Sequence, residues 1–248
     1  MKIYFSNNWG ENDEKCMFRI KKTTPNDNGI WKNISCTYNL NEADYVVCLG
    51  GLNRSLKFPL QKIITLQREP LVINGFNTEN KLHFPYTKLH HAWTDPQFIN
   101  LNYDEIKKIK YEEKKLHLST ITSMKLHTVD AKKRVNFIKN FCKRYPNVMD
   151  VYGRQWDGSL GSSYKGCPKT KYYALENYKY SLCIENSCYD NYFTEKITDC
   201  LLGWTIPIYF GCTNIDTYFP RDSYIWLDIN EPKSIDKLYE IIQNPLNE

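Results

Sequence analysis

The stretch that decides the fold runs from residue 178 to residue 211 and reads YKYSLCIENSCYDNYFTEKITDCLLGWTIPIYFG. Its apolar runs at residues 180–184 and 205–210 predict two buried strands, and Gly211 stops the second. Between the strands, a helix that begins at Thr194 is predicted from three apolar residues at helical spacing, Ile197, Leu201 and Trp204. A strand, a helix and a strand in this order are typical of a parallel α/β sheet.

Polar residues lie at both junctions of this stretch. Glu185 and Asn186 follow the carboxyl end of the first strand, where open α/β sheets bind ligands. Thr194, Glu195 and Lys196 open the helix, where free N–H groups and the helix dipole favour an anion. Lys196 adds a positive charge for that anion, and Glu195 could accept hydrogen bonds from sugar hydroxyls. The alternative is structural, with Thr194 capping the helix and Asn186 closing a turn.

The residues that precede this stretch continue the same alternation of strand and helix. Residues 116–121 and 148–152 are predicted strands, and residues 128–145 form an amphipathic helix with Thr128 as its N-cap. The Tyr-rich residues 169–178 are predicted to form a further helix. Repetition at this spacing predicts a doubly wound parallel sheet.

The first half of the chain carries its own series of short apolar runs, which predict strands at residues 2–5, 43–49 and 63–66. Residues 104–115 are the most charged stretch and predict a charged helix or linker at the domain boundary. We therefore expect an N-terminal domain at residues 1–113 and a C-terminal domain at residues 114–248. Two α/β halves imply a cleft between them.

Composition excludes several classes of protein. No apolar run approaches the roughly 18 residues that a membrane span needs, so a membrane protein is excluded. The N-terminus lacks the apolar core of a signal peptide, which disfavours secretion. The nine cysteines are odd in number and form no C-x-x-C pair. They favour reduced thiols and a cytoplasmic location, with disulfides as the alternative.

The net charge of +5 does not by itself indicate a nucleic-acid partner. Lys107, Lys108 and Lys110 are interleaved with acidic residues, as on a solvated helix face. A phosphate track would need a continuous basic stripe. We therefore expect no nucleic-acid partner, and a small anionic ligand suits the mild positive surplus.

Three motifs of the deciding stretch resemble the C-terminal signature of the α-1,3-fucosyltransferases, glycosyltransferase family 10. They are YKYSLCIENS at residues 178–187, YFTEKI at residues 192–197 and TIPIYFG at residues 205–211. Family members carry Phe-Glu-Asn, then Tyr-x-Thr-Glu-Lys, then Pro-(Ile/Val)-x-x-Gly at the same intervals. Weaker agreement extends outward to two segments, residues 151–154 and 218–225. The resemblance covers roughly residues 60–245 and is to the soluble bacterial or viral type.

The resemblance implies two Rossmann-like domains facing across a cleft, the GT-B architecture. It also implies an inverting enzyme that moves fucose from GDP-fucose to a hydroxyl of an acceptor glycan. The N-terminal domain would then lie on the acceptor side, and the C-terminal domain would bind the nucleotide sugar. Its partners would be that nucleotide sugar and the glycan.

The resemblance also assigns residues to the nucleotide. By position, Asn186, Tyr192, Glu195 and Lys196 would hold GDP, with Glu195 toward the ribose and Lys196 toward the diphosphate. Arg134 heads the helix where family members place a phosphate-binding arginine, so it would be a second diphosphate cation. Preorganised cations can stabilise a departing diphosphate without a metal.

Glu69 is the expected catalytic base. It lies in Gln67-Arg68-Glu69-Pro70, which resembles the family's first-domain motif with the proposed base. His90 and His91 are alternative polar groups on the acceptor side, although ordinary loop residues are the simpler interpretation. Arg154 is open between a role in the cleft and a structural ion pair.

We expect no cofactor and no obligatory metal. Asp150 and Asp157 would be the candidate ligands if transfer required one. Two alternative functions remain open at this point. One is an enzyme of the same fold that uses another nucleotide-sugar donor, and the other is a non-catalytic glycan-binding protein. The sequence leaves the acceptor, the linkage and the oligomeric state undetermined.

Overall fold

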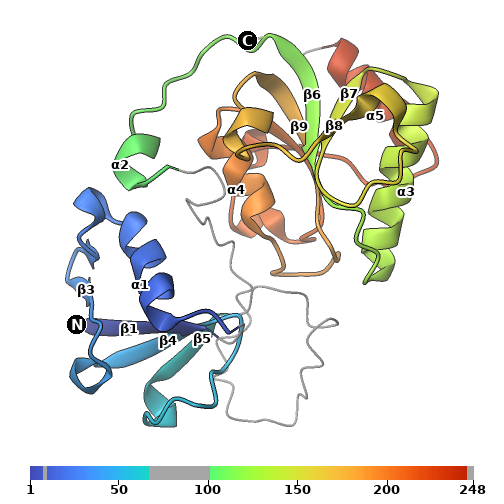
Figure 1. The fold of residues 1–248 in the computed structure, drawn as a ribbon. Coiled ribbons are helices and arrows are strands. Elements are labelled where there is room, and N and C mark those ends of the chain that lie inside the picture. The colour runs from blue at the N-terminus through green and yellow to red at the C-terminus, as the bar shows by residue number, and fades with distance from the viewer. Residues whose placement is uncertain (8–9, 67–100, 245–248) are drawn as a thin grey trace. The chain divides into compact units, whose positions relative to one another are not determined.

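The computed structural model describes residues 1–7, 10–66 and 101–244, and the chain divides into two compact units, Met1–Ile109 and Lys110–Glu248 (Figure 1). Each unit is built on a largely parallel sheet with helices packed on it. The fold class predicted for each half, α/β with a parallel sheet, is therefore confirmed.

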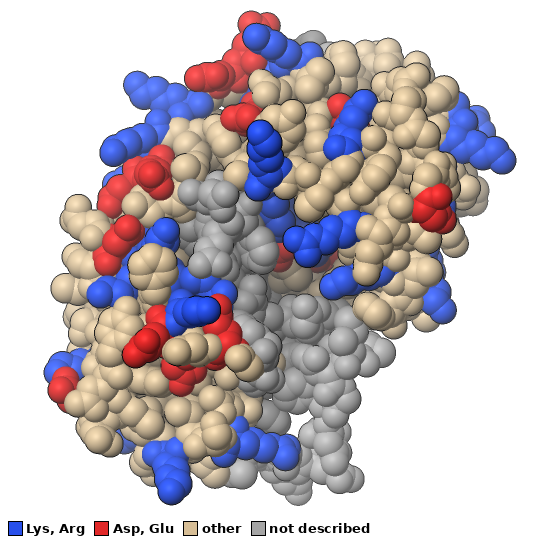
Figure 2. All heavy atoms as spheres, in the orientation of Figure 1, with Lys and Arg blue, Asp and Glu red and all other residues tan. Residues whose placement is uncertain are grey.

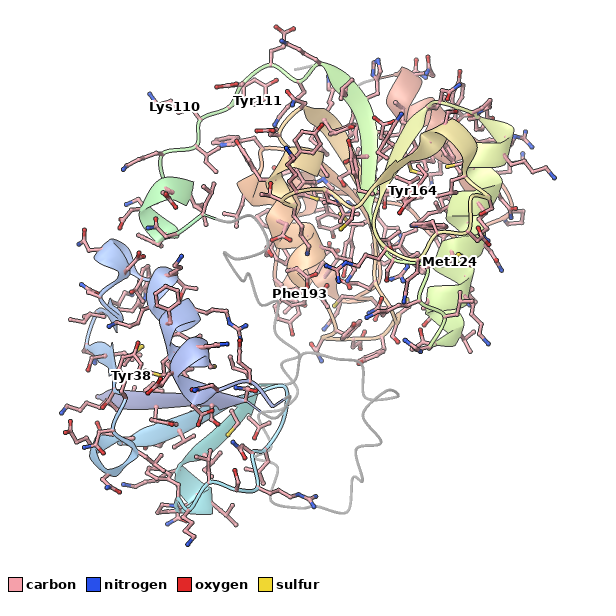
Figure 3. All side chains as sticks on the ribbon, in the orientation of Figure 1. Tyr38, Lys110, Tyr111, Met124, Tyr164 and Phe193 are labelled. Atoms are coloured by element: carbon pink, nitrogen blue, oxygen red, sulfur yellow. The ribbon has the colours of Figure 1, made fainter. Side chains whose placement is uncertain are left out.

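The charged stretch lies where one unit gives way to the other. Only a single helical turn forms there, α2 (Tyr103–Ile106), and Asn102 with Glu105 closes it in a capping box. Lys110 and Tyr111 lie on the extended segment that follows α2 (Figure 3). The predicted charged helix or linker is thus one turn of helix and then an extended linker.

The first unit contains a sheet of five strands in the order β2-β3-β1-β4-β5, parallel apart from the β2–β3 pair. The strands are β1 (Lys2–Asn7), β2 (Ile30–Trp31), β3 (Ile34–Cys36), β4 (Tyr45–Leu49) and β5 (Ile63–Leu66). The three strands predicted in the first half are confirmed as β1, β4 and β5. The short strands β2 and β3 were not predicted.

Helix α1 (Asp13–Lys22) covers one face of this sheet (Figure 1). It contributes to a core cluster of five buried residues, Ile3, Cys16, Ile20, Val47 and Leu49. Strand β4 is buried on both faces, because Val46 and Cys48 alternate with these residues and join a second cluster with Ile63. Burial on both faces explains why the sequence of β4 is a continuous apolar run.

The second unit contains six parallel strands in the order β11-β10-β9-β6-β7-β8. They are β6 (Leu116–Ile121), β7 (Met149–Tyr152), β8 (Tyr164–Gly166), β9 (Tyr178–Ile184), β10 (Ile206–Phe210) and β11 (Ile225–Trp226). The predicted strands of this half are confirmed as β6, β7, β9 and β10.

Helices cover both faces of the second sheet (Figure 1). Helices α3 (Val129–Arg144) and α5 (Ser234–Gln243) share one core cluster with strand residues such as Leu182 and Ile184. Helix α4 (Glu195–Leu202) contacts β9 and β10 from the other face. The predicted N-cap of α3 is confirmed, because the Thr128 side chain accepts a hydrogen bond from the Ala131 N–H at 2.9 Å.

The helix predicted at residues 169–178 is wrong. Only a 3₁₀ turn forms there, at Tyr172–Ala174. Strand β9 already begins at Tyr178, which pairs with Leu116 of β6. Pairing with β6 therefore places the end of this segment in a strand. Tyr also favours a strand over a helix.

Candidate functional site

The strand order of the second sheet reverses once, between β6 and β9. The chain adds β7 and β8 on one side of β6 and then places β9 on its other side. Ligands bind outside the carboxyl ends of the strands at such a reversal. Ser123 follows β6 there, and Asn186 follows β9. The fold thus makes this edge of the sheet the candidate site.

Arg134 of α3 reaches this edge and is almost fully buried, with 2% of its surface exposed. Its guanidinium donates to the Asn186 side-chain oxygen and, at 3.4 Å, to the Ser123 carbonyl. The buried Nε has no acceptor among the residues that the structure describes. Burial lowers the pKa of Arg134, although a guanidinium stays charged at neutral pH. The site thus contains a buried cation whose hydrogen-bonding capacity is not fully used.

The loop that follows β9 is held from the start of α3. The Thr128 hydroxyl donates to the Asn186 carbonyl, and the Asp130 carboxylate accepts from the Cys188 N–H at 3.0 Å. Asn186 is therefore fixed through both its backbone and its side chain. The structural alternative for Asn186, closing a turn, does not account for its contact with Arg134.

Glu185 is a buried carboxylate, 1% exposed, that joins the end of β9 to the start of α4. It accepts hydrogen bonds from the Thr194 N–H, the Thr194 hydroxyl and the Lys196 ammonium, each at 2.8 Å. Gly211 makes room for it, because a Cβ at that position would lie 2.5 Å from Glu185 Cγ. The glycine after β10 is thus required by the carboxylate after β9.

Thr194 and Lys196 both contact Glu185, a partner that the sequence did not predict for either of them. Thr194 is the N-cap residue of α4, but its side chain makes no capping hydrogen bond, because Glu185 engages the hydroxyl instead. Lys196 forms an ion pair with Glu185, and its ammonium lies 2.7 Å from the Thr194 hydroxyl. The Lys196 side chain is 16% exposed, so its charge is held in place at the start of α4.

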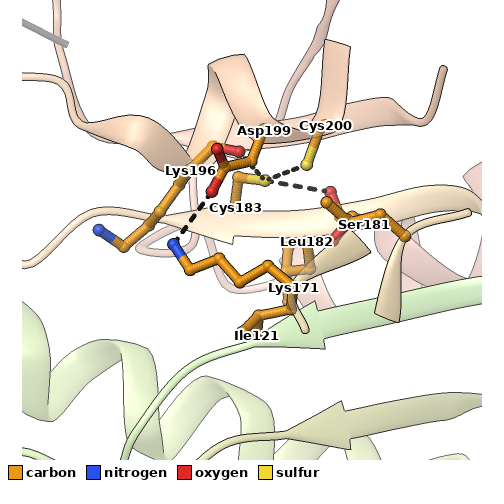
Figure 4. Close-up of a pocket in the computed structure, with 9 residues that line it drawn as sticks. Ile121, Lys171, Ser181, Leu182, Cys183, Lys196, Asp199 and Cys200 are labelled. Carbon is orange, nitrogen blue, oxygen red and sulfur yellow. Dashed lines mark hydrogen bonds and ion pairs between the residues drawn. The ribbon is translucent and has the colours of Figure 1, made fainter. Parts of the chain in front are cut away.

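Glu195 has a different partner, Lys171, which lies before β9. The Lys171 ammonium is 2.8 Å from Glu195 Oε1 and 3.0 Å from Asp199 Oδ2, as Figure 4 shows for Asp199. Burial alone would raise the pKa of Glu195, but the charges of Lys196 and Lys171 outweigh it and lower that pKa to about 2. Burial raises the pKa of Asp199 to about 7 against the opposing charge of Lys171. Glu195 is therefore ionised at neutral pH, whereas Asp199 is partly protonated.

A small pocket lies beside this group and is drawn in Figure 4. Its lining includes Lys171, Lys196 and Asp199 together with Cys183 and Cys200, whose sulfurs are 3.2 Å apart. The cavity volume of about 20 Å³ has room for about one water molecule. It is too small for a nucleotide, so a nucleotide would have to bind at the open edge of the sheet.

Aromatic residues pack in the loop that leads into α4. Tyr192 is 1% exposed, and its ring stacks on Tyr189 with centroids 5.0 Å apart. Phe193, labelled in Figure 3, contacts the rings of Tyr218 and Phe219. The ring of Tyr192 is thus part of the packed loop that holds Glu195 and Lys196 in position.

Arg154 lies at the end of β7, with its side chain exposed. Its carbonyl accepts from the Met124 N–H at 3.1 Å, which ties together the loops after β6 and β7. Gly153 permits this approach, because a Cβ there would lie 1.7 Å from the Thr122 carbonyl oxygen. Within the described part of the chain, Arg154 forms no ion pair, so the structural ion pair considered for it is not seen there.

The acceptor-side predictions lie outside the described residues. Glu69, His90 and His91 all fall in residues 67–100. The second unit therefore supplies all the charged groups of the site described above.

The two candidate metal ligands have other partners. Asp150 accepts from the Tyr178 hydroxyl at 2.7 Å and pairs with Lys165 at 3.3 Å. Asp157 pairs with Lys139 at 2.9 Å. Across residues 1–7, 10–66 and 101–244, no three His, Cys, Asp or Glu side chains group as metal ligands would.

Charge elsewhere on the molecule is dispersed. On the face that Figure 2 shows, Lys and Arg side chains are spread over both units with acidic side chains among them. The helices that the structure describes are all too short or too polar to cross a bilayer. The functional argument therefore depends on individual residues of the site.

Comparison with known proteins shows which protein family the chain belongs to. The model of the C-terminal part of glycosyltransferase family 10 (fucosyltransferase) matches residues 112–245, which is more than half of the 248 residues. The chain belongs to glycosyltransferase family 10. The family match contains β6 through α5, and with them every charged residue of the site described here.

Two similar proteins are fucosyltransferases by name. The human 3-galactosyl-N-acetylglucosaminide 4-alpha-L-fucosyltransferase FUT3 is 35% identical over 92 residues, which cover 35% of this chain and 23% of that protein. An Alpha-(1,4)-fucosyltransferase of Arabidopsis thaliana is 40% identical over 52 residues, 21% of this chain and 13% of that protein. The chain thus matches less than a quarter of the length of either relative.

A solved family 10 fold is also similar. A crystal structure of an alpha1,3-fucosyltransferase superposes with a TM-score of 0.50 at 19% identity, covering 98% of this chain and 78% of that chain. At this identity the likeness concerns the fold alone. It supports the family's two-sheet α/β fold, of the GT-B type, for this family 10 chain.

Reasoning from the sequence missed two members of the site. Lys171 lies in the segment that was wrongly predicted to be a helix, and no motif points to it. Glu185 was noticed as a polar residue after a strand, but its role as the partner of Lys196 was not. A signal for Glu185 exists in Gly211, since a glycine directly after a strand often marks close approach of another group.

Proposed function

We propose that this family 10 protein is a glycosyltransferase that moves fucose from GDP-fucose to a hydroxyl of an acceptor glycan. The observation that carries the proposal is the pair of held cations, Arg134 and Lys196, at the carboxyl edge of a parallel sheet. Such an edge is where open α/β sheets bind nucleotides. The names of similar proteins support fucose as the sugar.

The charges of the site suit a diphosphate. Arg134, Lys171 and Lys196 are positive, and Glu185 and Glu195 are negative. Asp199 adds little negative charge below neutral pH, because its pKa is raised to about 7 by burial. Below neutral pH, three cations against two carboxylates therefore leave one net positive charge for an anionic ligand, and ionisation of Asp199 above about pH 7 offsets it. Held cations of this kind stabilise the charge that develops on a leaving diphosphate without reorganising.

Roles for individual residues follow from this arrangement and from the family motif. Arg134 and Lys196 would contact the diphosphate, and Glu195 would accept hydrogen bonds from the ribose hydroxyls. Asn186 would contact the nucleotide beside Arg134, to which it is hydrogen-bonded. Tyr192 would shape the site from the packed loop before α4. Arg154, although exposed, stays a candidate contact for the bound sugar nucleotide.

The transfer step would invert the anomeric centre. A base removes the proton of the acceptor hydroxyl while that oxygen attacks the anomeric carbon and GDP departs. Glu69 is the residue that we propose as this base. No obligatory metal is part of the mechanism, because the cations of Arg134 and Lys196 supply positive charge where the diphosphate would leave.

A reducing, cytoplasmic location is also part of the proposal. It is supported by the nine cysteines, all of which are free thiols in the structure. Thiol labelling of protein taken from its native source without reductant, followed by mass spectrometry, tests it. Disulfides between these cysteines would contradict the proposed location.

Nucleotide binding is the first experimental test. GDP at 100-fold excess over its Kd should stabilise the protein by about 2.7 kcal/mol and raise its Tm. UDP at the same concentration should not. A protein that UDP stabilises and GDP does not would be a family 10 relative with another donor. A protein that neither nucleotide stabilises would contradict the proposed function.

The second test is transfer itself. Incubation with GDP-fucose and a panel of galactose- and N-acetylglucosamine-containing oligosaccharides should release GDP and add one deoxyhexose mass to an acceptor. Activity should persist in excess EDTA. Complete loss on chelation, restored by Mn²⁺ or Mg²⁺, would contradict the metal-free mechanism. GDP binding without transfer to any acceptor would favour a glycan-binding protein instead.

A further inference from the structure

Glu195 and Lys196 are adjacent residues of opposite charge at the start of α4, yet each is paired with a different element. Adjacent side chains on a helix point about 100° apart. Lys196 pairs with Glu185 after β9, and Glu195 pairs with Lys171 before β9, each at 2.8 Å. Lys171 thus gives Glu195 an ion-pair partner of its own, while the Lys196 ammonium contacts Glu185.

Lys171 contacts two carboxylates on one face of α4. Glu195 and Asp199 are four residues apart and therefore lie one above the other on the helix. The Lys171 side chain is 19% exposed, that of Glu195 is 21% exposed and that of Asp199 is 3% exposed. Figure 4 shows Lys171 reaching Asp199 from the segment before β9. Of the two carboxylates, Glu195 is therefore the one that solvent reaches.

We propose that Lys171 is a positioning residue that holds the Glu195 carboxylate in the orientation that binds the ribose of the nucleotide. An ionised carboxylate has about four acceptor positions. The Lys171 ammonium takes one at Oε1, which leaves others for ribose hydroxyls. The inference rests on the proposed function, because it needs a nucleotide at this edge of the sheet.

A purely structural role is the alternative for Lys171. Asp199 is buried, and its Oδ1 has no partner among the described residues, so Lys171 could serve only as the counterion that Asp199 needs. The two roles separate if the charge of Asp199 is removed. In an Asp199→Asn background the counterion is not needed, whereas Glu195 still has to be positioned.

The experiment compares two ligands on four proteins. The proteins are the wild type, Lys171→Met, Asp199→Asn and the double variant Lys171→Met/Asp199→Asn, all as the full chain. The ligands are GDP and 2′,3′-dideoxy-GDP, which lacks both ribose hydroxyls, and calorimetry gives each Kd. Circular dichroism and the Tm check the fold of each variant.

The expected readout is the ratio of the two Kd values. The wild type and Asp199→Asn should bind GDP about tenfold more tightly than the dideoxy compound, the usual effect of a hydrogen bond to a charged group. The double variant should lose this preference because its Kd for GDP rises toward its Kd for the dideoxy compound. Its Kd for the dideoxy compound should stay within about threefold of the wild-type Kd for the same compound. A structural role would leave the preference intact or weaken both ligands equally.

Other outcomes are also decisive. A wild-type ratio in the double variant would show that Lys171 is only a counterion and would overturn the inference. Equal binding of both ligands by the wild type would leave the nucleotide site standing but would overturn the role of Glu195, and that of Lys171 with it. If the wild type binds neither ligand, the proposed function fails before any variant is made. Should both methionine variants fail to fold, the uncharged polar variant Lys171→Gln in the Asp199→Asn background replaces them, and an unchanged ratio there would overturn the inference.

Discussion

Polar residues gather near the ends of strands in both units, but the two groups differ in charge. In the first unit, Asp13 accepts from the hydroxyls of Ser6 at 2.8 Å and Tyr4 at 2.9 Å, and Asn53 donates to Ser6. That group has one carboxylate among neutral donors. In the second unit, by contrast, buried cations and carboxylates meet at the edge of the sheet, as the Lys196–Glu185 pair shows.

The difference indicates which group serves a ligand. Burying a charged pair costs several kcal/mol per ion, and well-packed apolar residues would often be no less stable. A group such as that around Asp13 needs only hydrogen bonds that offset the burial of polar atoms. The charged group of the second unit is therefore better explained by binding than by stability.

The largest loss of transfer activity is expected from a change at Glu69, which lies outside the described residues. Glu69→Gln keeps the size of the side chain but removes its basicity. Transfer should fall by about 10²–10⁴ because the proposed base is lost. GDP affinity should change little because the proposed nucleotide site lies in the second unit. Steady-state transfer assays and calorimetry measure the two quantities.

Two results would contradict this division. Near-wild-type turnover of Glu69→Gln would mean that another residue is the base, and His90→Gln and His91→Gln would be tested next. Loss of GDP binding in Glu69→Gln would mean that the first unit contributes to the donor site.

Arg134→Ala should have the next largest effect and tests the charged group directly. Because a charge-assisted hydrogen bond to the diphosphate is lost, GDP binding should weaken by about 1.5–3 kcal/mol. Lys139→Ala on the same helix is the matched control, since Lys139 pairs with the exposed Asp157 and should leave GDP binding unchanged. Calorimetry on folded protein measures both. Equal affinities of the two variants would place the diphosphate elsewhere.

Asp13→Ala tests the neutral group of the first unit. Its loss leaves the Tyr4 and Ser6 hydroxyls without their acceptor, which should cost about 1–3 kcal/mol of local stability. Burial and the hydrogen bond to Asp13 raise the pKa of Tyr4 to about 12, which agrees with this contact. Native-state hydrogen exchange of β1 and α1 should become faster, while GDP affinity stays constant. Weaker GDP binding in this variant would contradict the proposal that only the charged group of the second unit serves the ligand.

The last prediction concerns the pH dependence of stability at Asp199. Its pKa rises from 3.8 unfolded to about 7 folded, so the folded state binds the extra proton. Its contribution to stability is therefore present below about pH 4 and is lost as the pH rises to about 7. Relative to Asp199→Asn, the wild type should lose up to about 4 kcal/mol across this window, because each pKa unit corresponds to about 1.36 kcal/mol.

Chemical denaturation at several pH values measures this difference. Glu195 does not interfere, because its pKa is lowered and its opposite effect lies between about pH 2 and 4.5. A difference between the two proteins that does not vary with pH would show that Asp199 stays ionised in the fold.

Local patterns predicted most of the second unit. Strand β6 has the predicted bounds, and α3 begins after the predicted N-cap Thr128, because apolar periodicity and capping act over a few residues. The prediction of a helix at residues 169–178 was wrong because Tyr178 pairs with β6 and belongs to a strand. Helix α1 was missed because its buried face is only three residues, Cys16, Met17 and Ile20.

The sequence by itself determined the chemistry available to this protein. The motif that ends in Glu195 and Lys196, the polar residues after β9 and the glycine after β10 were all visible as types and spacings. They were sufficient to indicate an anion site and the family resemblance, because a helix start and a strand end are local features.

Only the tertiary structure decided how these charges are paired. Glu195 pairs with Lys171 across 24 residues of sequence, Lys196 with Glu185 across 11, and Arg134 contacts Asn186 across 52. These contacts arise because β9 lies beside β6, with α3 packed on one face of the sheet and α4 on the other. Strand order is set by the burial of whole faces, a sum over many distant residues that no local pattern contains.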